Sequence, residues 1–181
     1  MDYYDPFIYW LERGKSKADI FSPDKIRFID RFLNSIKFES VFEIGAGDGE
    51  LTKIILKHTT PSNYTGCDLS EARVEKLKQL FPEIDIKQFD VRFMMLPADL
   101  IICSHVLLHI PPGDIMNLLS KMISHTKKHI IFFEPLYGKT PQPWAYYNFE
   151  YDFVEFFKQL GYELKVYPFD NNTGLYHFVK N

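Results

Sequence analysis

The chain has 181 residues, of which 46% are hydrophobic, 17% aromatic and 25% charged, the composition of a globular domain. Its formal net charge of -3 and pI of about 6.1 exclude the broad cationic surface that binds nucleic acid without regard to sequence. No apolar run approaches the roughly 20 residues that span a bilayer, and residues 1–10 do not resemble a signal peptide. We therefore expect one cytoplasmic domain over residues 1–181, with no membrane partner.

The first predicted element is an amphipathic helix within residues 19–37. Ser22 is a suitable N-cap residue, and Pro23 suits the first helical turn. We expect residues 1–37 to form a helical cap on the domain. The apolar residues that recur with helical spacing are Ile20, Ile26, Ile29, Phe32, Leu33 and Ile36.

From residue 41 onwards, short apolar runs alternate with helical segments. This alternation predicts a parallel sheet whose strands are mostly buried on both faces. The predicted strands are residues 41–44, 64–67, 84–89, 100–103 and 130–133. The predicted helices between and after them are residues 51–58, 71–81, 114–125 and 151–160.

The end of the chain breaks this alternation. Two apolar runs, residues 162–167 and 175–179, flank turn residues 170–174, which predicts an antiparallel hairpin. The expected fold class is therefore α/β: a doubly wound, mostly parallel, seven-stranded sheet with a C-terminal antiparallel hairpin and helices on both faces.

The most informative stretch is residues 41–49, an apolar strand that leads into three alternate glycines and then a helix. Glycine permits positive φ and close approach of the backbone to a ligand. A helix that begins directly after such a loop presents free N–H groups to that ligand. We expect a binding pocket beside this first strand.

Acidic residues stand at the ends of three successive predicted strands. Glu43 is at the first strand's end, Asp68 ends the second and Asp90 ends the third. Asp68 comes about 20 residues after the glycines, where a carboxylate accepts hydrogen bonds from both ribose hydroxyls. These spacings predict a nucleoside ligand.

At this point the residues resemble the class I S-adenosylmethionine-dependent methyltransferase family, whose first motif is an acid, one residue and then GxGxG, as Glu43 to Gly49 reads here. The resemblance covers residues 38–134 strongly and implies S-adenosylmethionine (SAM) as the cofactor. Within it, the acid and glycines line the methionine end, Asp68 holds the ribose and the next strand end meets adenine. The implied cofactor residues are Glu43, Gly45, Ala46, Gly47, Asp68, Leu69, Asp90, Val91 and Ser104.

Two residues are candidates for catalysis. The resemblance places His105 beside the sulfonium, where it could act as a general base or have a structural role. Glu134, at the end of the fifth strand, is expected at the pocket rim in contact with the acceptor. The acceptor is expected to be a small molecule.

Aromatic residues outside the regular α/β pattern are candidates for acceptor binding. Trp10, Trp144 and Tyr147 could close a lid over the pocket and exclude water, or could simply pack on the domain.

Two other functions stay open. An NAD-dependent oxidoreductase would need GxGxxG, but Glu50 stands at the third glycine position. A non-catalytic SAM-binding scaffold would keep the same cofactor residues. We expect no metal site, because His105 and His109 lack the glutamate of the helical zinc motif and two prolines follow them.

Overall fold

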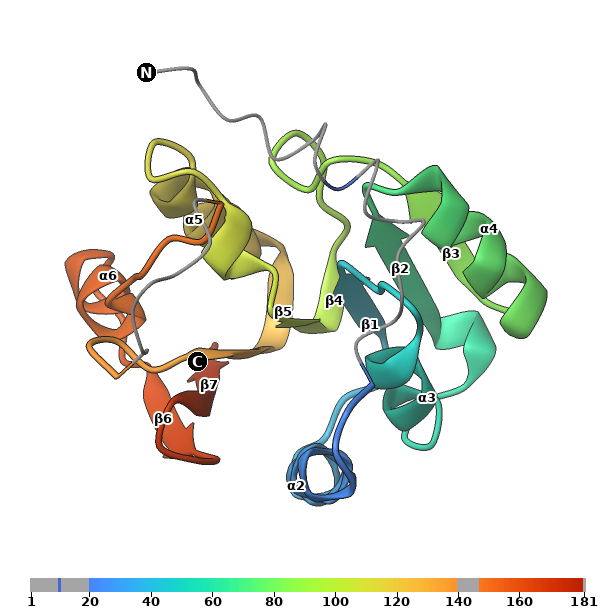
Figure 1. Cartoon of the computed structure of the whole chain (residues 1–181), viewed down its shortest axis with the longest axis horizontal. Helices are drawn as coiled ribbons and strands as arrows, with labels where there is room; N and C mark the ends of the chain where they lie inside the picture. The colour runs from blue at the N-terminus through green and yellow to red at the C-terminus, as the bar shows by residue number, and fades with distance from the viewer. Residues whose placement is uncertain (1–9, 11–19, 140–146, 181) are drawn as a thin grey trace.

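The computed structural model describes residues 10, 20–139 and 147–180, which form one seven-stranded sheet in the order β3-β2-β1-β4-β5-β7-β6 (Figure 1). Strands β1 to β5 are parallel to one another, while β7 is antiparallel to both β5 and β6. The predicted fold class is thereby confirmed. The strands are β1 (Val41–Ile44), β2 (Tyr64–Asp68), β3 (Asp85–Gln88), β4 (Ala98–Ser104), β5 (Thr126–Pro135), β6 (Lys165–Pro168) and β7 (Thr173–Val179).

Helices cover both faces of the sheet, and each face has its own buried apolar cluster. Side chains from α2, α3 and α4 pack on one face, and side chains from α5 and α6 pack on the other (Figure 1). The helices are α2 (Pro23–Asn34), α3 (Glu50–Ile55), α4 (Glu71–Leu80), α5 (Ile115–His125) and α6 (Phe153–Gln159), with 3-10 turns η1 (Pro61–Asn63) and η2 (Leu107–His109).

Several predicted boundaries differ from the structure for identifiable reasons. Helix α2 begins at Pro23 because the Ser22 side chain accepts a hydrogen bond from the Lys25 backbone N–H, which confirms the predicted cap. Strand β5 is longer than the predicted 130–133 because pairing with β4 begins at Thr126 and pairing with β7 continues to Pro135. Strand β3 is an exception to the burial on both faces expected of most strands, since it is an edge strand in which Ile86 alone is buried.

The predicted N-terminal cap, residues 1–37, falls within the described residues only at Trp10 and from Ile20 onwards, and Trp144 also lies outside them. Among the helices of the described ranges, none is both long and apolar enough to cross a membrane.

The sheet register determines where the site lies. Ile44, the last residue of β1, pairs with Cys67 on one side and Cys103 on the other. The carboxyl ends of β1, β2 and β4 therefore meet at one edge of the sheet. Asp68 and Ser104, each one residue further along, flank the start of the glycine loop.

Candidate active site

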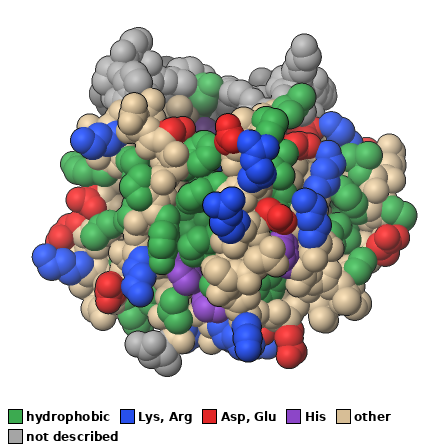
Figure 2. Space-filling model, turned by 90° about the horizontal axis from the view of Figure 1, so that it is seen from below, with side chains coloured by type: hydrophobic (Ala, Val, Ile, Leu, Met, Phe, Trp, Pro, Cys, Tyr) green, Lys and Arg blue, Asp and Glu red, His purple; other side chains and the backbone are tan. Residues whose placement is uncertain are grey.

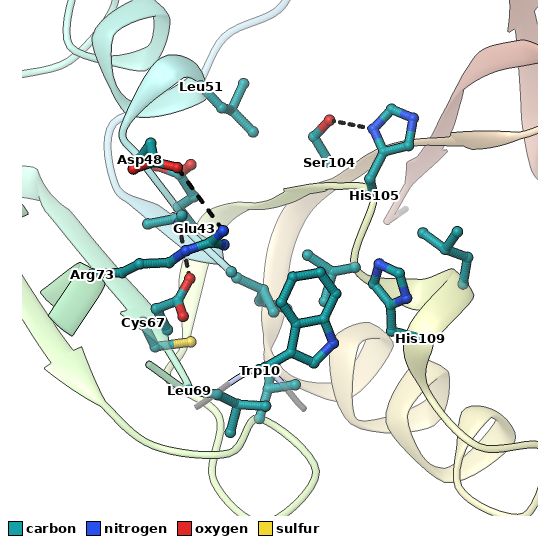
Figure 3. Close-up of a pocket in the computed structure, with 18 of the residues that line it drawn as sticks. Trp10, Glu43, Asp48, Leu51, Cys67, Leu69, Arg73, Ser104, His105 and His109 are labelled. Carbon is teal, nitrogen blue, oxygen red and sulfur yellow. Dashed lines mark hydrogen bonds and ion pairs between the residues drawn. The ribbon is translucent and has the colours of Figure 1, made fainter. Parts of the chain in front are cut away.

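A cavity of about 520 Å³ lies at this edge of the sheet (Figure 3). Its volume falls within the roughly 300–1,000 Å³ typical of small-molecule sites. Residues from α2, from the glycine loop and from the ends of β2 and β4 line it, together with residues 147–148. The cavity therefore brings together segments that are far apart in the sequence.

The glycine loop adopts a backbone conformation that requires glycine at two positions facing the cavity. Gly45 has φ +67° and Gly47 has φ +57°, both in the left-handed region. A Cβ on Gly45 would lie 2.5 Å from Cγ2 of Val106, so a side chain there would clash as well as strain the backbone. The Ala46 N–H donates to the Cys67 carbonyl at 3.0 Å, which ties the loop to β2.

Asp68 is the polar centre of the cofactor end. Its side chain is 7% exposed, and its two oxygens accept hydrogen bonds from the backbone N–H groups of Gly47 at 2.8 Å and Ser70 at 2.9 Å. Burial raises the pKa of Asp68, while these two N–H groups and the nearby Arg73 guanidinium act in the opposite direction. The carboxylate lines the cavity and keeps lone pairs for a ligand hydroxyl.

Glu43 is fully buried beneath the loop. Its Oε2 accepts hydrogen bonds from the Thr52 hydroxyl at 2.7 Å and from the Tyr64 hydroxyl at 2.5 Å. Burial raises the pKa of Glu43 to about 7, although both hydrogen bonds oppose the shift. Among the described residues Oε1 has no hydrogen-bond partner, so the site offers a buried acceptor that fits a cationic donor such as an amino-acid ammonium.

Asp90 lies just beyond β3 and is engaged by a neighbour. Its carboxylate accepts from the Arg92 backbone N–H at 2.8 Å and from that side chain's Nε at 2.9 Å and Nη2 at 2.6 Å. A carboxylate offers about four acceptor positions, so roughly one is left for a ligand amine. Leu69 and the buried Val91 line the same end of the cavity.

Ser104 and His105 follow β4 on the other side of the glycine loop. Lys25 of α2 donates through Nζ to Ser104 Oγ at 3.1 Å and lies 3.3 Å from His105 Nδ1. Because an ammonium can only donate, Nδ1 accepts and Nε2 carries the proton. Burial, followed by the Lys25 charge, lowers the pKa of His105 to about 3.

The expected position of Glu134 is wrong. Its side chain is fully buried, and the cavity lining does not include it. Its Oε1 accepts from the backbone N–H groups of Val106 at 2.8 Å and Leu107 at 2.9 Å, and Oε2 accepts from that of Leu108 at 3.4 Å. Glu134 therefore anchors η2 rather than contacting an acceptor.

Two of the predicted aromatic residues line the cavity, Trp10 and Tyr147. The centroids of the Trp10 and His109 rings are 4.5 Å apart, and Cζ of Arg73 lies 5.6 Å from the Trp10 ring centroid. The indole therefore lies between Arg73 on one side of the cavity and His109 on the other (Figure 3). His109 Nδ1 approaches the Tyr147 carbonyl at 3.4 Å. Within the described ranges, no cluster of three or more potential metal ligands occurs.

Sequence analysis missed several polar residues of the cavity wall, among them Lys25, Arg73 and Asn148. Lys25 had a readable signal, because it shares the i, i+4, i+8 spacing of the buried Ile29 and Leu33. Asn148, whose buried Oδ1 has no partner among the described residues, had none, since it lies in an irregular segment.

Comparison with known proteins agrees with this geometry. Residues 42–129 match the family model described as a methyltransferase domain. The chain therefore contains a methyltransferase domain, and the predicted resemblance to class I S-adenosylmethionine-dependent methyltransferases is confirmed. SAM is accordingly its cofactor, and this assignment replaces the NAD-dependent alternative. The comparison with curated proteins returned no match.

Solved structures of methyltransferases share the fold. Magnesium protoporphyrin IX methyltransferase (ChlM) from Synechocystis PCC 6803, with bound SAM, has a TM-score of 0.72 at 16% identity and covers 100% of both chains. The DhpI-SAM-HEP complex has a TM-score of 0.74 at 14% identity, over 96% of this chain and 95% of that chain. The mitomycin 7-O-methyltransferase MmcR has a TM-score of 0.66 at 14% identity, over 86% of this chain and 54% of that chain. At these identities the likeness concerns the fold alone.

The geometry of Asp68 generates a binding prediction. Replacing Asp68 with Ala should weaken binding of S-adenosylhomocysteine more than about tenfold, because charge-assisted hydrogen bonds contribute about 1.5–3 kcal/mol. Calorimetric titration measures this change. Ser70→Ala is the control: it removes the side-chain cap of α4 and costs about 1 kcal/mol of stability but leaves the carboxylate in place. Equal affinity of wild type and Asp68→Ala would contradict the ribose assignment.

The raised pKa of Glu43 generates a stability prediction. Folding raises this pKa from 4.5 to about 7, so the stabilisation from the bound proton is complete below pH 4.5 and is lost as pH rises through 7. Between about pH 5.5 and 8.5 the free energy of unfolding of wild type should fall about 2 kcal/mol further than that of Glu43→Gln. Denaturant unfolding of both proteins at both pH values measures this difference in the free energy of unfolding.

The comparison of wild type with Glu43→Gln separates the contribution of Glu43 to the pH dependence of stability from the contributions of other titratable groups. Burial also raises the pKa of Glu134 to about 7, whereas it lowers the pKa of His105 to about 3 and that of His177 to about 4, which acts in the opposite direction. All three are present in both proteins. Parallel pH profiles for wild type and Glu43→Gln would show that Glu43 is ionised in the folded state.

Proposed function

We propose that this methyltransferase transfers the methyl group of SAM to a small-molecule acceptor bound in the same cavity. The observation that carries the proposal is the continuity of that cavity from Asp68 and the glycine loop, past the end of β4, to His109 and Asn148. One continuous cavity of about 520 Å³ thus joins a nucleoside-binding end to a second end with its own polar groups.

The residues at the first end fit the cofactor. Asp68 suits the ribose hydroxyls, the unpartnered Oε1 of Glu43 suits an ammonium, and the backbone of Gly45 and Gly47 allows close approach. Leu69 and Val91 supply apolar surface for a purine. When bound, SAM supplies an electrophilic methyl group on a sulfonium.

His105 does not suit the role of general base. Its pKa of about 3 makes it a weak base at neutral pH, and its Nδ1 already accepts from Lys25. The ring can instead donate a hydrogen bond through Nε2. Catalysis then rests on positioning donor and acceptor, and the nucleophile must react through its own acidity, as a phenol or carboxylic acid does.

Two further observations support a small acceptor. Two of the structural neighbours have a small molecule in their names: magnesium protoporphyrin IX methyltransferase and mitomycin 7-O-methyltransferase. On the molecular face in Figure 2, Lys and Arg side chains are interspersed with Asp and Glu rather than gathered into one basic patch. Both observations favour an acceptor that enters the cavity over a polymer that binds across the surface.

The test has two stages. S-adenosylhomocysteine is first titrated into the protein by calorimetry, and the protein is then incubated with methyl-labelled SAM and a small-molecule extract. We expect saturable binding and transfer of label to a low-molecular-weight product, with binding weakened more than about tenfold and transfer reduced in Asp68→Ala. Tight binding without transfer to any fraction would favour the non-catalytic scaffold.

The aromatic wall generates a prediction for the same assay. Tyr147→Ala should lower label transfer severely while changing S-adenosylhomocysteine affinity less than about threefold, or about 0.7 kcal/mol, because Tyr147 lies across the cavity from Asp68 at η2. Tyr137→Ala is a matched control, since that tyrosine is exposed and outside the cavity lining. Parallel loss of binding and transfer would make Tyr147 a general structural support.

A further inference from the structure

Asn148 carries one of two unsatisfied polar atoms in the cavity wall. Among the described residues, Glu43 Oε1 and Asn148 Oδ1 are the two buried side-chain oxygens or nitrogens that have no hydrogen-bond partner. Both residues line the same cavity. Folded proteins pair the large majority of such atoms, because a buried acceptor without a partner has lost its hydrogen bonds to water. Two exceptions in one cavity therefore indicate two positions at which a ligand completes the hydrogen bonding.

The backbone next to Asn148 is fixed to η2. The Phe149 N–H donates to the Leu108 carbonyl at 2.7 Å, and the Tyr151 hydroxyl donates to the Ile110 carbonyl. These bonds fix the segment that carries Asn148, whereas the χ2 torsion of an asparagine side chain is broad. A rotation of the carboxamide can therefore turn Oδ1 towards a ligand in the cavity while the backbone stays in place.

Glu134 is a second support of this arrangement. Its carboxylate accepts hydrogen bonds from the backbone N–H groups of Val106, Leu107 and Leu108. Leu108 is also the residue whose carbonyl pairs with the N–H that follows Asn148. A buried carboxylate thus holds η2, and η2 in turn holds the segment that carries Asn148. Supporting contacts of this kind keep a ligand-binding side chain in a defined position.

Asn148 lies on the His109 side of the Trp10 indole. The indole lies between His109 of η2 and Arg73, which belongs to the first turn of α4 near the ribose carboxylate (Figure 3). His109 Nδ1 approaches the Tyr147 carbonyl at 3.4 Å, so Asn148 directly follows a contact on that side. The strand order agrees, because η2 follows β4, whereas the predicted cofactor carboxylates lie at or beyond the ends of β1, β2 and β3. Asn148 therefore belongs to the second end of the cavity.

We infer that Asn148 Oδ1 accepts a hydrogen bond from a phenolic hydroxyl group of the methyl acceptor. Phenols and carboxylic acids both react through their own acidity, but they differ in protonation at neutral pH. A phenol has a pKa of about 10 and keeps its proton, whereas a carboxylic acid has a pKa of about 4 and loses it. Only the phenol can donate to Oδ1, and Leu108 and Ile110 supply apolar cavity wall for its ring. This inference rests on the proposed function, and it makes Asn148 a substrate-binding residue that takes no proton.

The test compares phenol with toluene, which has a similar shape but no hydrogen-bond donor. Each is titrated into the full chain saturated with S-adenosylhomocysteine, and binding is followed by amide chemical-shift changes. The ratio of phenol affinity to toluene affinity should be at least about fivefold higher in wild type than in Asn148→Leu, which removes the acceptor oxygen at similar volume. Asn148→Asp keeps an acceptor oxygen and should keep the ratio within about threefold of wild type. Benzoate should bind wild type at least about fivefold more weakly than phenol.

Two controls separate this contact from general effects on folding. Asn117→Leu changes an exposed asparagine of α5 outside the cavity lining and should behave as wild type. A crystal structure of wild type with S-adenosylhomocysteine and phenol needs no variant, and it should place the phenol oxygen about 2.7 Å from Asn148 Oδ1.

Four results would overturn the inference. They are phenol absent from Asn148 in that crystal structure, an undiminished affinity ratio in Asn148→Leu, tighter binding of benzoate than of phenol, and no binding of phenol. A ratio lost as completely in Asn148→Asp as in Asn148→Leu would assign the contact to Nδ2 and overturn it equally.

A final arm tests whether Oδ1 contacts the cofactor instead. S-adenosylhomocysteine is titrated into wild type and Asn148→Leu, and we expect its affinity to change less than about threefold. A larger loss would assign Oδ1 to the cofactor and overturn the acceptor assignment. Failure of S-adenosylhomocysteine to bind wild type would instead refute the proposed function, and the phenol and toluene titrations of the unloaded protein would still test Asn148.

Discussion

The hydrogen bond from the Gly47 N–H to the Asp68 carboxylate, 2.8 Å long, is the interaction on which the cofactor end depends. It joins the loop after β1 to the end of β2, and the other oxygen of the same carboxylate accepts from the Ser70 N–H at the start of α4. One buried charge thus sets the positions of the glycine loop and of the neighbouring helix. The N–H groups and Arg73 offset the cost of its burial, which keeps an acceptor in place for ribose.

Burial has different consequences for the two buried glutamates at strand ends. It raises the pKa of both Glu43 and Glu134 to about 7. Glu134 uses both its oxygens on the backbone of η2, so its role is complete within the fold. Glu43 receives two hydroxyl donors on one oxygen and has the other without a partner among the described residues. The unsatisfied oxygen, rather than the shifted pKa, distinguishes a ligand-binding glutamate from a structural one.

The sequence alone was sufficient for features that depend on local patterns. The parallel sheet follows from the alternation of apolar runs and helices, and the glycine loop follows from glycines that must adopt positive φ. Glu134 was misplaced because the direction of its side chain depends on three amides of η2, a tertiary contact that no local pattern encodes. The full extent of β5 likewise depends on pairing with β7. Lys25 was visible in the helical spacing, but its meaning required knowing that α2 lies beside the end of β4.

The two ends of the cavity are built from different parts of the chain, and His105 shows how the second end is kept compatible with the first. Burial lowers the pKa of His105 to about 3, and the Lys25 charge acts in the same direction. The ring is therefore neutral at physiological pH, and because its Nδ1 accepts from Lys25, its proton is on Nε2. A neutral ring adds no second positive charge to the cavity when the sulfonium of SAM is bound, which is the arrangement that methyl transfer by positioning requires.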